Sequence, residues 1–272
     1  MARRKVSTVI NIYSKKVKDQ IVELCRNFFG REGLEYLVGD VFQCVDELIK
    51  NSIKANYKFI MVLSKLYDKH MLDQPDADEK TLNEQINNLI KDKSSFDIIA
   101  PEIYREHNLV DQVRRVLNEE ATQIKLKDKA YISNRECNAS EIEQLRSLKR
   151  LAHIKNLLKK NDVRTLLKIE SDGQFIFIEV TNTAPITDID LKRIHEKRDE
   201  FLQYHKVGRE YEFFVNHLDT TDSGFGLGYA TIDSMLIGIG LDPYQTIQIL
   251  AASDTTVILS FPIAELKQLQ KD

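Results

Sequence analysis

The chain has 272 residues, of which 42% are hydrophobic and 30% are charged, and its formal net charge is −3. This length and composition suit one large domain or two modest ones, and they exclude a disordered or repeat-rich chain. The near balance of charge gives the whole molecule no attraction for nucleic acid or for an anionic membrane.

The cysteines and the apolar runs bear on the cellular compartment in which the protein is expected. Cys25, Cys44 and Cys137 are widely spaced, and they form neither a disulfide framework nor a metal-ligand spacing. No apolar run approaches the ~20 residues that a membrane-spanning helix needs. The N-terminal apolar stretch is too short and too polar for a signal-peptide core. We therefore expect a cytoplasmic protein with no membrane span.

The first seventy residues predict a strand followed by helices. Residues 6–13 mix β-branched and polar side chains, which is typical of a strand. Residues 15–29 place apolar side chains along one stripe, and the glycines at 30 and 33 end that helix. Residues 34–66 predict one or more long helices.

The middle of the chain predicts helices only. Segments near 82–90, 109–126 and 139–160 are polar and charged, with apolar side chains at helical spacing. The third segment predicts one amphipathic helix with its N-cap at Asn138 or Ser140. We interpret residues 72–162 as an all-helical insertion, which either extends the scaffold or serves as a regulatory or dimerisation module.

The last hundred residues return to strands. Two apolar runs around Asp172 and Gly173 predict a β-hairpin, because an Asp-Gly pair suits a tight turn. A short helix is expected at 188–194. Residues 246–250 and 255–262 predict the last two strands, and 264–271 predict a polar tail.

Two separate stretches carry chemistry. Gly224, Gly226 and Gly228 precede a helical apolar run, so their N–H groups and the helix dipole favour a phosphate, although a plain tight turn explains the glycines equally well. Far upstream, Glu47 and Asn51 share one helix face. A carboxylate can orient water, and an amide oxygen is a ligand suited to magnesium.

Together the two stretches resemble the GHKL superfamily of ATP-binding domains. This superfamily includes sensor histidine kinases, gyrase-type topoisomerases, mismatch-repair ATPases and ninety-kilodalton heat-shock chaperones. Residues 47–52 resemble its N box, and residues 224–228 resemble its second glycine box. The resemblance covers about the first sixty residues and the last hundred or so.

The resemblance implies a fold and a domain plan. The fold is α+β, a two-layer α/β sandwich with a mixed, mainly antiparallel sheet and helices on one face. Residues 1–71 and 163–272 would form the two parts of the ATP-binding domain, on either side of the helical insertion.

The resemblance also implies site residues for ATP and Mg²⁺. Asn51 would ligate the magnesium ion, Lys54 would contact the nucleotide, and the backbone from Gly224 through Gly226 and Leu227 to Gly228 would cradle the phosphates. Asn182 stands where the first glycine box has an Asp, and its carbonyl oxygen can still accept a hydrogen bond from the adenine amine. Ala184 and Ile186 replace the glycines of that box. Thr255 would meet the adenine edge.

The segment after the first glycine box corresponds to the lid of the family. Its basic residues could pair with phosphate oxygens, although a solvated surface helix explains each of them as well; they are Lys197, Arg198, Lys206 and Arg209.

Three alternative functions are consistent with these residues. The first is an ATPase in which Glu47 is the general base. The second is a kinase that transfers phosphate to a separate protein in signalling; autophosphorylation in the usual order is not expected, because no histidine precedes Asn51. The third is a nucleotide-gated or non-catalytic interaction module. The expected partners are ATP and another protein, with a homodimer left open, and neither nucleic acid nor membrane.

Overall fold

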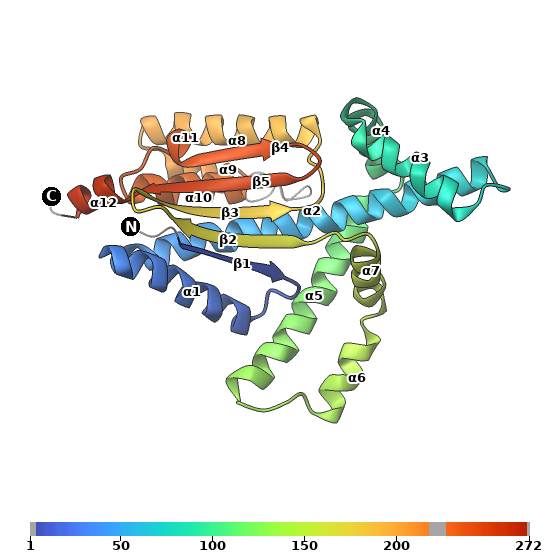
Figure 1. Ribbon diagram of the computed structural model, residues 1–272, viewed down its shortest axis with the longest axis horizontal. Coiled ribbons are helices and arrows are strands. Elements are labelled where there is room, and N and C mark those ends of the chain that lie inside the picture. The colour runs from blue at the N-terminus through green and yellow to red at the C-terminus, as the bar shows by residue number, and fades with distance from the viewer. Residues whose placement is uncertain (1–3, 218–226, 271–272) are drawn as a thin grey trace.

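The computed structural model describes residues 4–217 and 227–270 and has an α+β fold with one five-stranded antiparallel sheet (Figure 1). The strand order is β1-β2-β3-β5-β4. The strands are β1 (Arg4–Ile10), β2 (Thr165–Ser171), β3 (Phe175–Asn182), β4 (Ile247–Ala251) and β5 (Thr255–Pro262). The α+β class is as predicted.

The expected mixture of parallel and antiparallel pairing is wrong for the described strands, all of which pair antiparallel. Short connections decide this, because β2–β3 and β4–β5 are hairpins and a short turn reverses the chain. In the first hairpin Asp172 Oδ1 accepts hydrogen bonds from the N–H groups of Gln174 and Phe175, both at 2.8 Å. Gly173 has φ 91°, which an L side chain would strain, so the predicted Asp-Gly turn is confirmed.

The N-terminal helices form as the apolar spacing predicts. Helix α1 (Lys15–Phe29) has the predicted bounds, and the 3-10 turns η1 (Gly30–Glu32) and η2 (Glu35–Leu37) lead to α2. The second predicted helical region, 34–66, is one continuous helix, α2 (Val38–Asp73). Its 36 residues span about 54 Å, which is long enough to cross the whole molecule.

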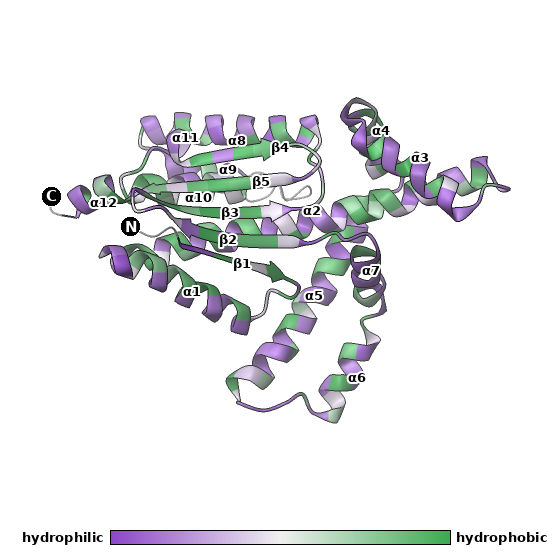
Figure 2. Ribbon diagram, viewed as in Figure 1, coloured by the Kyte–Doolittle hydropathy of each residue, from purple (hydrophilic) through white to green (hydrophobic). Residues whose placement is uncertain are grey.

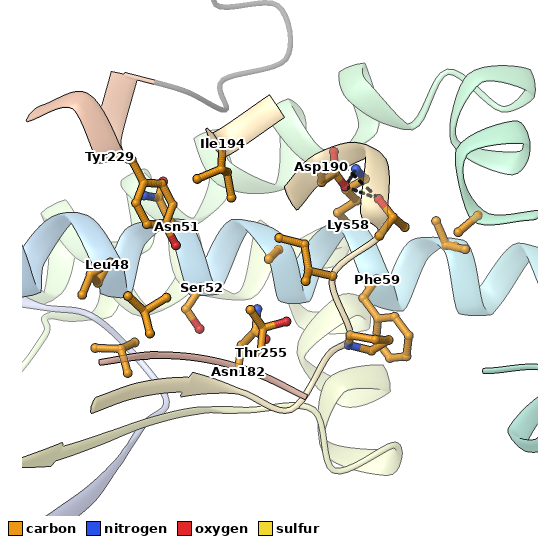
Figure 3. A pocket seen from close by; sticks show the side chains of 18 of the residues that line it. Leu48, Asn51, Ser52, Lys58, Phe59, Asn182, Asp190, Ile194, Tyr229 and Thr255 are labelled. Carbon is orange, nitrogen blue, oxygen red and sulfur yellow. Dashed lines mark hydrogen bonds and ion pairs between the residues drawn. The ribbon is translucent and has the colours of Figure 1, made fainter. Parts of the chain in front are cut away.

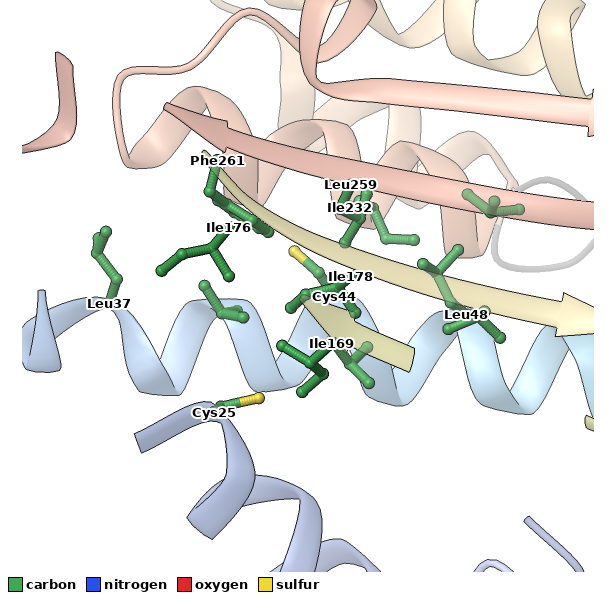
Figure 4. Packing of buried hydrophobic residues seen from close by; sticks show 14 of the residues in the cluster. Cys25, Leu37, Cys44, Leu48, Ile169, Ile176, Ile178, Ile232, Leu259 and Phe261 are labelled. Carbon is green, nitrogen blue, oxygen red and sulfur yellow. The ribbon is translucent and has the colours of Figure 1, made fainter. Parts of the chain in front are cut away.

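The first hydrophobic core lies between the sheet and α2. Strands β3 and β5 alternate buried and half-buried side chains, so one face of the sheet carries Ile176, Ile178, Leu259 and Phe261 into this core. Figure 4 shows these residues above Leu48 of α2, and Ile232 of α10 beside Leu259. Burying such apolar surface is the main stabilising term of the fold.

A second hydrophobic core surrounds the far half of α2. It is built by α3 (Glu79–Lys91), α4 (Lys93–Glu106), α5 (Leu109–Ile132) and α7 (Lys149–Lys160), whereas α6 (Ala139–Ser147) adds no residue to it. Residues from Tyr57 to Leu66 of α2 belong to this core. Figure 2 shows the apolar colour along the strands and α2, with hydrophilic stretches on the outlying helices. Helix α2 therefore joins two cores.

Two features of the helical segment differ from the prediction. Helix α4 was not predicted, although Phe96, Ala100 and Ile103 on one stripe are buried. The expected single helix over 139–160 is two helices that meet at Leu148, where ψ is 62°. Of the two predicted N-caps, Asn138 and Ser140, the structure has Asn138, whose side chain accepts from the N–H of Glu141 in a capping box.

The remaining helices lie in the C-terminal part of the chain. They are α8 (Asp188–Lys206), α9 (Glu210–His217), α10 (Leu227–Gly238), α11 (Pro243–Thr246) and α12 (Ile263–Leu269). The expected polar tail is wrong, because Ile263 and Leu266 bury their side chains in the first core and make this stretch a helix. None of the described helices combines the length and the apolar character that crossing a membrane requires.

Candidate functional site

One face of α2 looks into an open cavity beside the sheet. The space amounts to about 760 Å³ when the open solvent at its mouth is included, and about 80 Å³ of it admits the centres of water molecules. Its walls come from α2, α4, the end of β3, the start of β5, the 185–187 loop, α8 and α10. Its lining residues include Asn51, Ser52, Lys58, Phe59, Val62, Phe96, Asn182, Ile186, Asp190, Tyr229 and Thr255 (Figure 3).

Asn51 and Gly228 meet at one end of this cavity. A Cβ atom placed on Gly228 would lie 2.7 Å from Asn51 Nδ2, closer than real Cβ atoms come to a neighbour. Gly228 stands in the first turn of α10, and the next residue, Tyr229, lines the cavity with Asn51 (Figure 3). The sequence-predicted Asn51, Leu227 and Gly228 are thus brought to one place by the fold. Gly224 and Gly226 lie outside the described residues.

Asn182 and Thr255 meet at the opposite wall. They are direct partners in the β3–β5 pairing and both are buried. The Thr255 hydroxyl donates to the carbonyl of Ala184 at 3.0 Å, which holds the loop after β3 in place. Asn182 Oδ1 has no hydrogen-bond partner and is closed off from water. A buried acceptor without a partner costs about 1–3 kcal/mol, so a ligand that supplies a donor here would recover that energy.

One side of the cavity is formed by an ion pair that the sequence did not predict. Lys58 Nζ hydrogen-bonds to Asp190 near the start of α8, and the same ammonium lies 4.6 Å from the ring centre of Tyr104. Asp190 Oδ2 also accepts from the hydroxyl of Thr187, the N-cap of α8, at 3.0 Å. Two signals in the sequence could have located this pair: Lys58 lies two helical turns after Asn51, and Thr187 stands three residues before Asp190, as an N-cap does.

Apolar side chains from distant segments close the inner part of the cavity. Phe59 and Val62 come from α2, and Phe96 and Ala100 come from α4. The Phe59 and Phe96 ring centres are 6.0 Å apart. No local signal in the sequence assigned α4 to this cavity, because its contacts join residues about forty positions apart.

Lys54 lies half-buried on the helix face of Asn51 and Lys58, although it is not among the residues that line the cavity. Burial lowers the pKa of Lys54 to about 8, and the positive charges of Lys58 and Arg114 add to this shift. Such a site favours an anion, because an anion restores part of the lost solvation of the ammonium group.

Glu47 does not line the cavity, and its carboxylate is engaged elsewhere. Glu47 Oε1 accepts from Lys50 Nζ at 2.7 Å, while the same ammonium lies 2.5 Å from Asp46 Oδ2. Although burial acts in the opposite direction, the hydrogen bonds to Asp46 and Glu47 raise the pKa of Lys50. Glu47 therefore sits beside the site in an ion-paired cluster.

Arg198, one of the basic residues considered as phosphate partners, is bound to another side chain inside the fold. Arg198 is buried and makes a two-pronged hydrogen bond to Asp233 of α10, with distances of 2.8–3.1 Å. Neither a phosphate-binding nor a surface role fits this side chain. It ties α8 to α10, the helix that carries Gly228, and so fixes the position of one wall.

Among the described residues, no group of three or more His, Cys, Asp or Glu side chains is arranged to hold a metal ion. A magnesium ion at the cavity would have Asn51 as its ligand on α2. Comparisons of the chain with protein-family models, with curated proteins and with solved structures find no match.

Proposed function

We propose that the chain binds Mg²⁺-ATP in the cavity between α2, α8, α10 and the β3–β5 pair, as a GHKL-type ATP-binding domain. The observation that carries this proposal is that Asn51 and Asn182 line one cavity while Gly228 contacts Asn51, although the three residues come from separate sequence motifs. Local composition does not require these segments to converge. Their convergence supports a two-layer sandwich of that type, with residues 72–162 as its helical insertion.

The base end of the site is formed by Asn182. Its unpartnered Oδ1 supplies an acceptor for the exocyclic amine of adenine, and the apolar side chains of Phe59, Val62 and Ile186 supply surface for the ring. A guanine base would present a carbonyl oxygen at the corresponding position, opposite the oxygen of Asn182. We therefore expect the site to favour ATP over GTP.

The phosphate end of the site is formed by the start of α10 and by α2. The positive end of the α10 dipole favours phosphate, and Gly228 lets the backbone come within reach of Asn51. The Asn51 carboxamide oxygen would help to hold the magnesium ion. The ammonium of Lys54 would neutralise phosphate charge. The bound ion would itself neutralise charge on the transferred phosphoryl group.

The fate of the bound nucleotide depends on Glu47. Hydrolysis, or transfer of phosphate to another protein in signalling, needs this carboxylate, or another group in its place, directed at the reacting oxygen. The ion pair between Glu47 and Lys50 favours a second candidate, a nucleotide-gated interaction module that binds ATP and turns it over slowly. If Glu47 leaves Lys50 when nucleotide binds, its carboxylate can serve turnover; if it stays paired with Lys50, the chain acts as a nucleotide-gated interaction module.

The proposal is tested by calorimetry with Mg²⁺ and a non-hydrolysable ATP analogue. We expect binding tighter than millimolar for the wild-type chain, and about tenfold weaker binding in Asn182→Leu, because a lost hydrogen bond in a buried site costs about 1–3 kcal/mol. Asn56→Leu is the matched control, since Asn56 is equally buried and has an unpartnered Oδ1 but lies outside this cavity. No binding to the wild-type chain, or equal affinity for the ATP and GTP analogues, contradicts the proposal.

The helical segment would report the bound nucleotide. Because Phe96 and Ala100 line the same cavity, we expect nucleotide to slow hydrogen exchange in α4 as well as in α10. A protein partner of the helical segment could then sense the occupied site.

A further inference from the structure

A second cavity lies on the opposite side of α2. Ile53, Asn56 and Tyr57 line it from α2, whereas Asn51 and Lys58 look into the first cavity. Successive helix residues are rotated by about 100°, so these two sets point away from each other. The second cavity is bounded by the ends of β1 and β2 and by α5 and α7 (Figure 1). The space amounts to about 1190 Å³ when the open solvent at its mouth is included, and about 500 Å³ of it admits the centres of water molecules.

Asn56 gives this cavity a buried polar side chain with one unpartnered oxygen. The side chain is only 4% exposed, and its Nδ2 donates to Thr165 Oγ1 at 3.1 Å. Asn56 Oδ1 has no hydrogen-bond partner. A buried carboxamide oxygen in this state costs stability, which a donor from a bound molecule would restore.

Two ionised groups of the lining, Glu120 and Lys155, form an ion pair. Glu120 is buried at 5% exposure, and its Oε1 lies 3.4 Å from Lys155 Nζ. Lys155 also donates to Gln123 at 2.6 Å. Burial raises the pKa of the Tyr57 hydroxyl, with the Glu120 charge adding to the effect, so that group stays neutral. A ligand with a net charge would disturb this balance, and an uncharged ligand would not.

The exposed side chains of Lys159, Asp162 and Arg164 also line the cavity, and apolar side chains make up much of the remaining wall. Ile10, Ile53, Leu158 and Val163 contribute hydrocarbon surface to the lining. A ring or branched chain would bury apolar area against these residues. The lining thus combines one unpartnered acceptor with an apolar surface, which is the usual composition of a small-molecule site.

We propose that this cavity binds a small, uncharged organic molecule that presents an N–H donor to Asn56 Oδ1 and an apolar body to Ile53, Leu158 and Val163. Primary amides and aminated aromatic rings have this chemistry. The site does not depend on nucleotide binding.

The site adjoins the first cavity through a short buried chain of hydrogen bonds. Thr165 Oγ1, which accepts from Asn56, shares a hydrogen bond of 2.8 Å with Ser52 Oγ, and Ser52 lines the first cavity. Thr165 is also the strand partner of Asn182. A ligand at Asn56 therefore lies two hydrogen bonds from the residues of the other site.

The test compares two probes of nearly equal shape, benzamide and acetophenone, on the full chain without nucleotide. Acetophenone carries a methyl group where benzamide carries its amide nitrogen. We expect benzamide to bind about tenfold more tightly, the value of one hydrogen bond to a buried acceptor. NMR titration should show benzamide shifting the amide signals of residues 53–57 and 163–165. Equal affinities, no binding of benzamide, or shifts confined to the first cavity would overturn the proposal.

Two variants assign the preference to its residue. Asn56→Leu should bind the two probes equally, whereas Asn182→Leu, which removes the matching oxygen in the first cavity, should retain the preference for benzamide. The reverse pattern would move the site to the first cavity and overturn the assignment. The wild-type comparison decides the proposal if Asn56→Leu does not fold. Because Asn182 lines the first cavity and Asn56 lines the second, loss of nucleotide binding in Asn182→Leu and loss of the benzamide preference in Asn56→Leu test the two proposals separately.

Discussion

The carboxamide of Asn51 occupies the space that a side chain at Gly228 would need, with only 2.7 Å between Asn51 Nδ2 and the Cβ position of Gly228. These residues stand 177 positions apart in the chain. Their contact joins the polar face of α2 to the first turn of α10. A side chain at this position would therefore displace the end of the Asn51 side chain.

The first prediction concerns this contact. Gly228→Ala should displace the Asn51 carboxamide and weaken binding of the Mg²⁺-ATP analogue at least tenfold, because the magnesium ligand is lost from its position. The fold should survive, since alanine is the better helix former. Gly238→Ala is the matched control in the same helix, because a Cβ there meets nothing within 4 Å. Undiminished binding in Gly228→Ala would remove Asn51 from the site.

The second prediction concerns pH. The pKa of Lys54 is lowered to about 8 in the nucleotide-free protein, and a bound triphosphate favours its protonated form. Affinity should therefore be full below pH 8 and should fall, by at most about tenfold per pH unit, as pH rises above that value. Calorimetry across this range measures the effect. Lys54→Met should bind more weakly and should lose this part of the pH dependence; an unchanged profile would contradict the role of Lys54.

The same lowered pKa has a consequence for stability. An unfolded chain holds the Lys54 proton up to the usual pKa of 10.5, whereas the folded chain releases it near 8. Burial of the ammonium thus destabilises the fold below that pH, and the penalty is relieved as pH rises toward the unfolded value. Lys54→Met should accordingly unfold at a higher urea concentration than the wild type at neutral pH.

The third prediction concerns turnover. If the chain hydrolyses ATP, Glu47→Gln should reduce phosphate release by at least about a hundredfold while binding is kept, as expected for loss of a general base. Lys50→Met should raise release, because Lys50 holds the Glu47 carboxylate through a 2.7 Å hydrogen bond. A phosphate-release assay measures both. Equal release from the wild type and Glu47→Gln would exclude Glu47 from the mechanism.

The fourth prediction concerns the buried pair of Arg198 and Asp233. Arg198→Met should cost about 3–5 kcal/mol in the free energy of unfolding, because it leaves an unpaired carboxylate in the interior. The double variant Arg198→Met, Asp233→Leu should recover much of that loss. Urea unfolding of the single and double variants checks the coupling. If the two single changes add independently, the pair does not act as a unit.

Several parts of the fold could be predicted because their signals are local. The bounds of α1 follow from its apolar stripe, the β2–β3 hairpin follows from Asp172 and Gly173, and the capping box follows from Asn138. Each signal involves residues a few positions apart. The motifs around Asn51 and Asn182 were identified in the same way, as short patterns with a chemical meaning.

Other parts could not be predicted because partners from distant segments create them. Helix α12 exists as a packed element because Leu266 is buried in the first core, and its sequence by itself resembles a polar tail. Helix α4 reaches the first cavity through Phe96 and Ala100. The ion pair of Lys58 with Asp190 joins two elements separated by the whole helical segment.

The sequence by itself thus determined several elements, among them α1 and the β2–β3 hairpin, and indicated candidate site residues, since helical periodicity, turn residues and capping act within a few positions along the chain. Only the tertiary structure decided that Asn51 and Asn182 share one cavity, that Gly228 contacts Asn51, that Glu47 is paired with Lys50, and that Asn56 lines a second cavity. Burial and packing couple residues without regard to their separation in the chain, and no local pattern records that coupling.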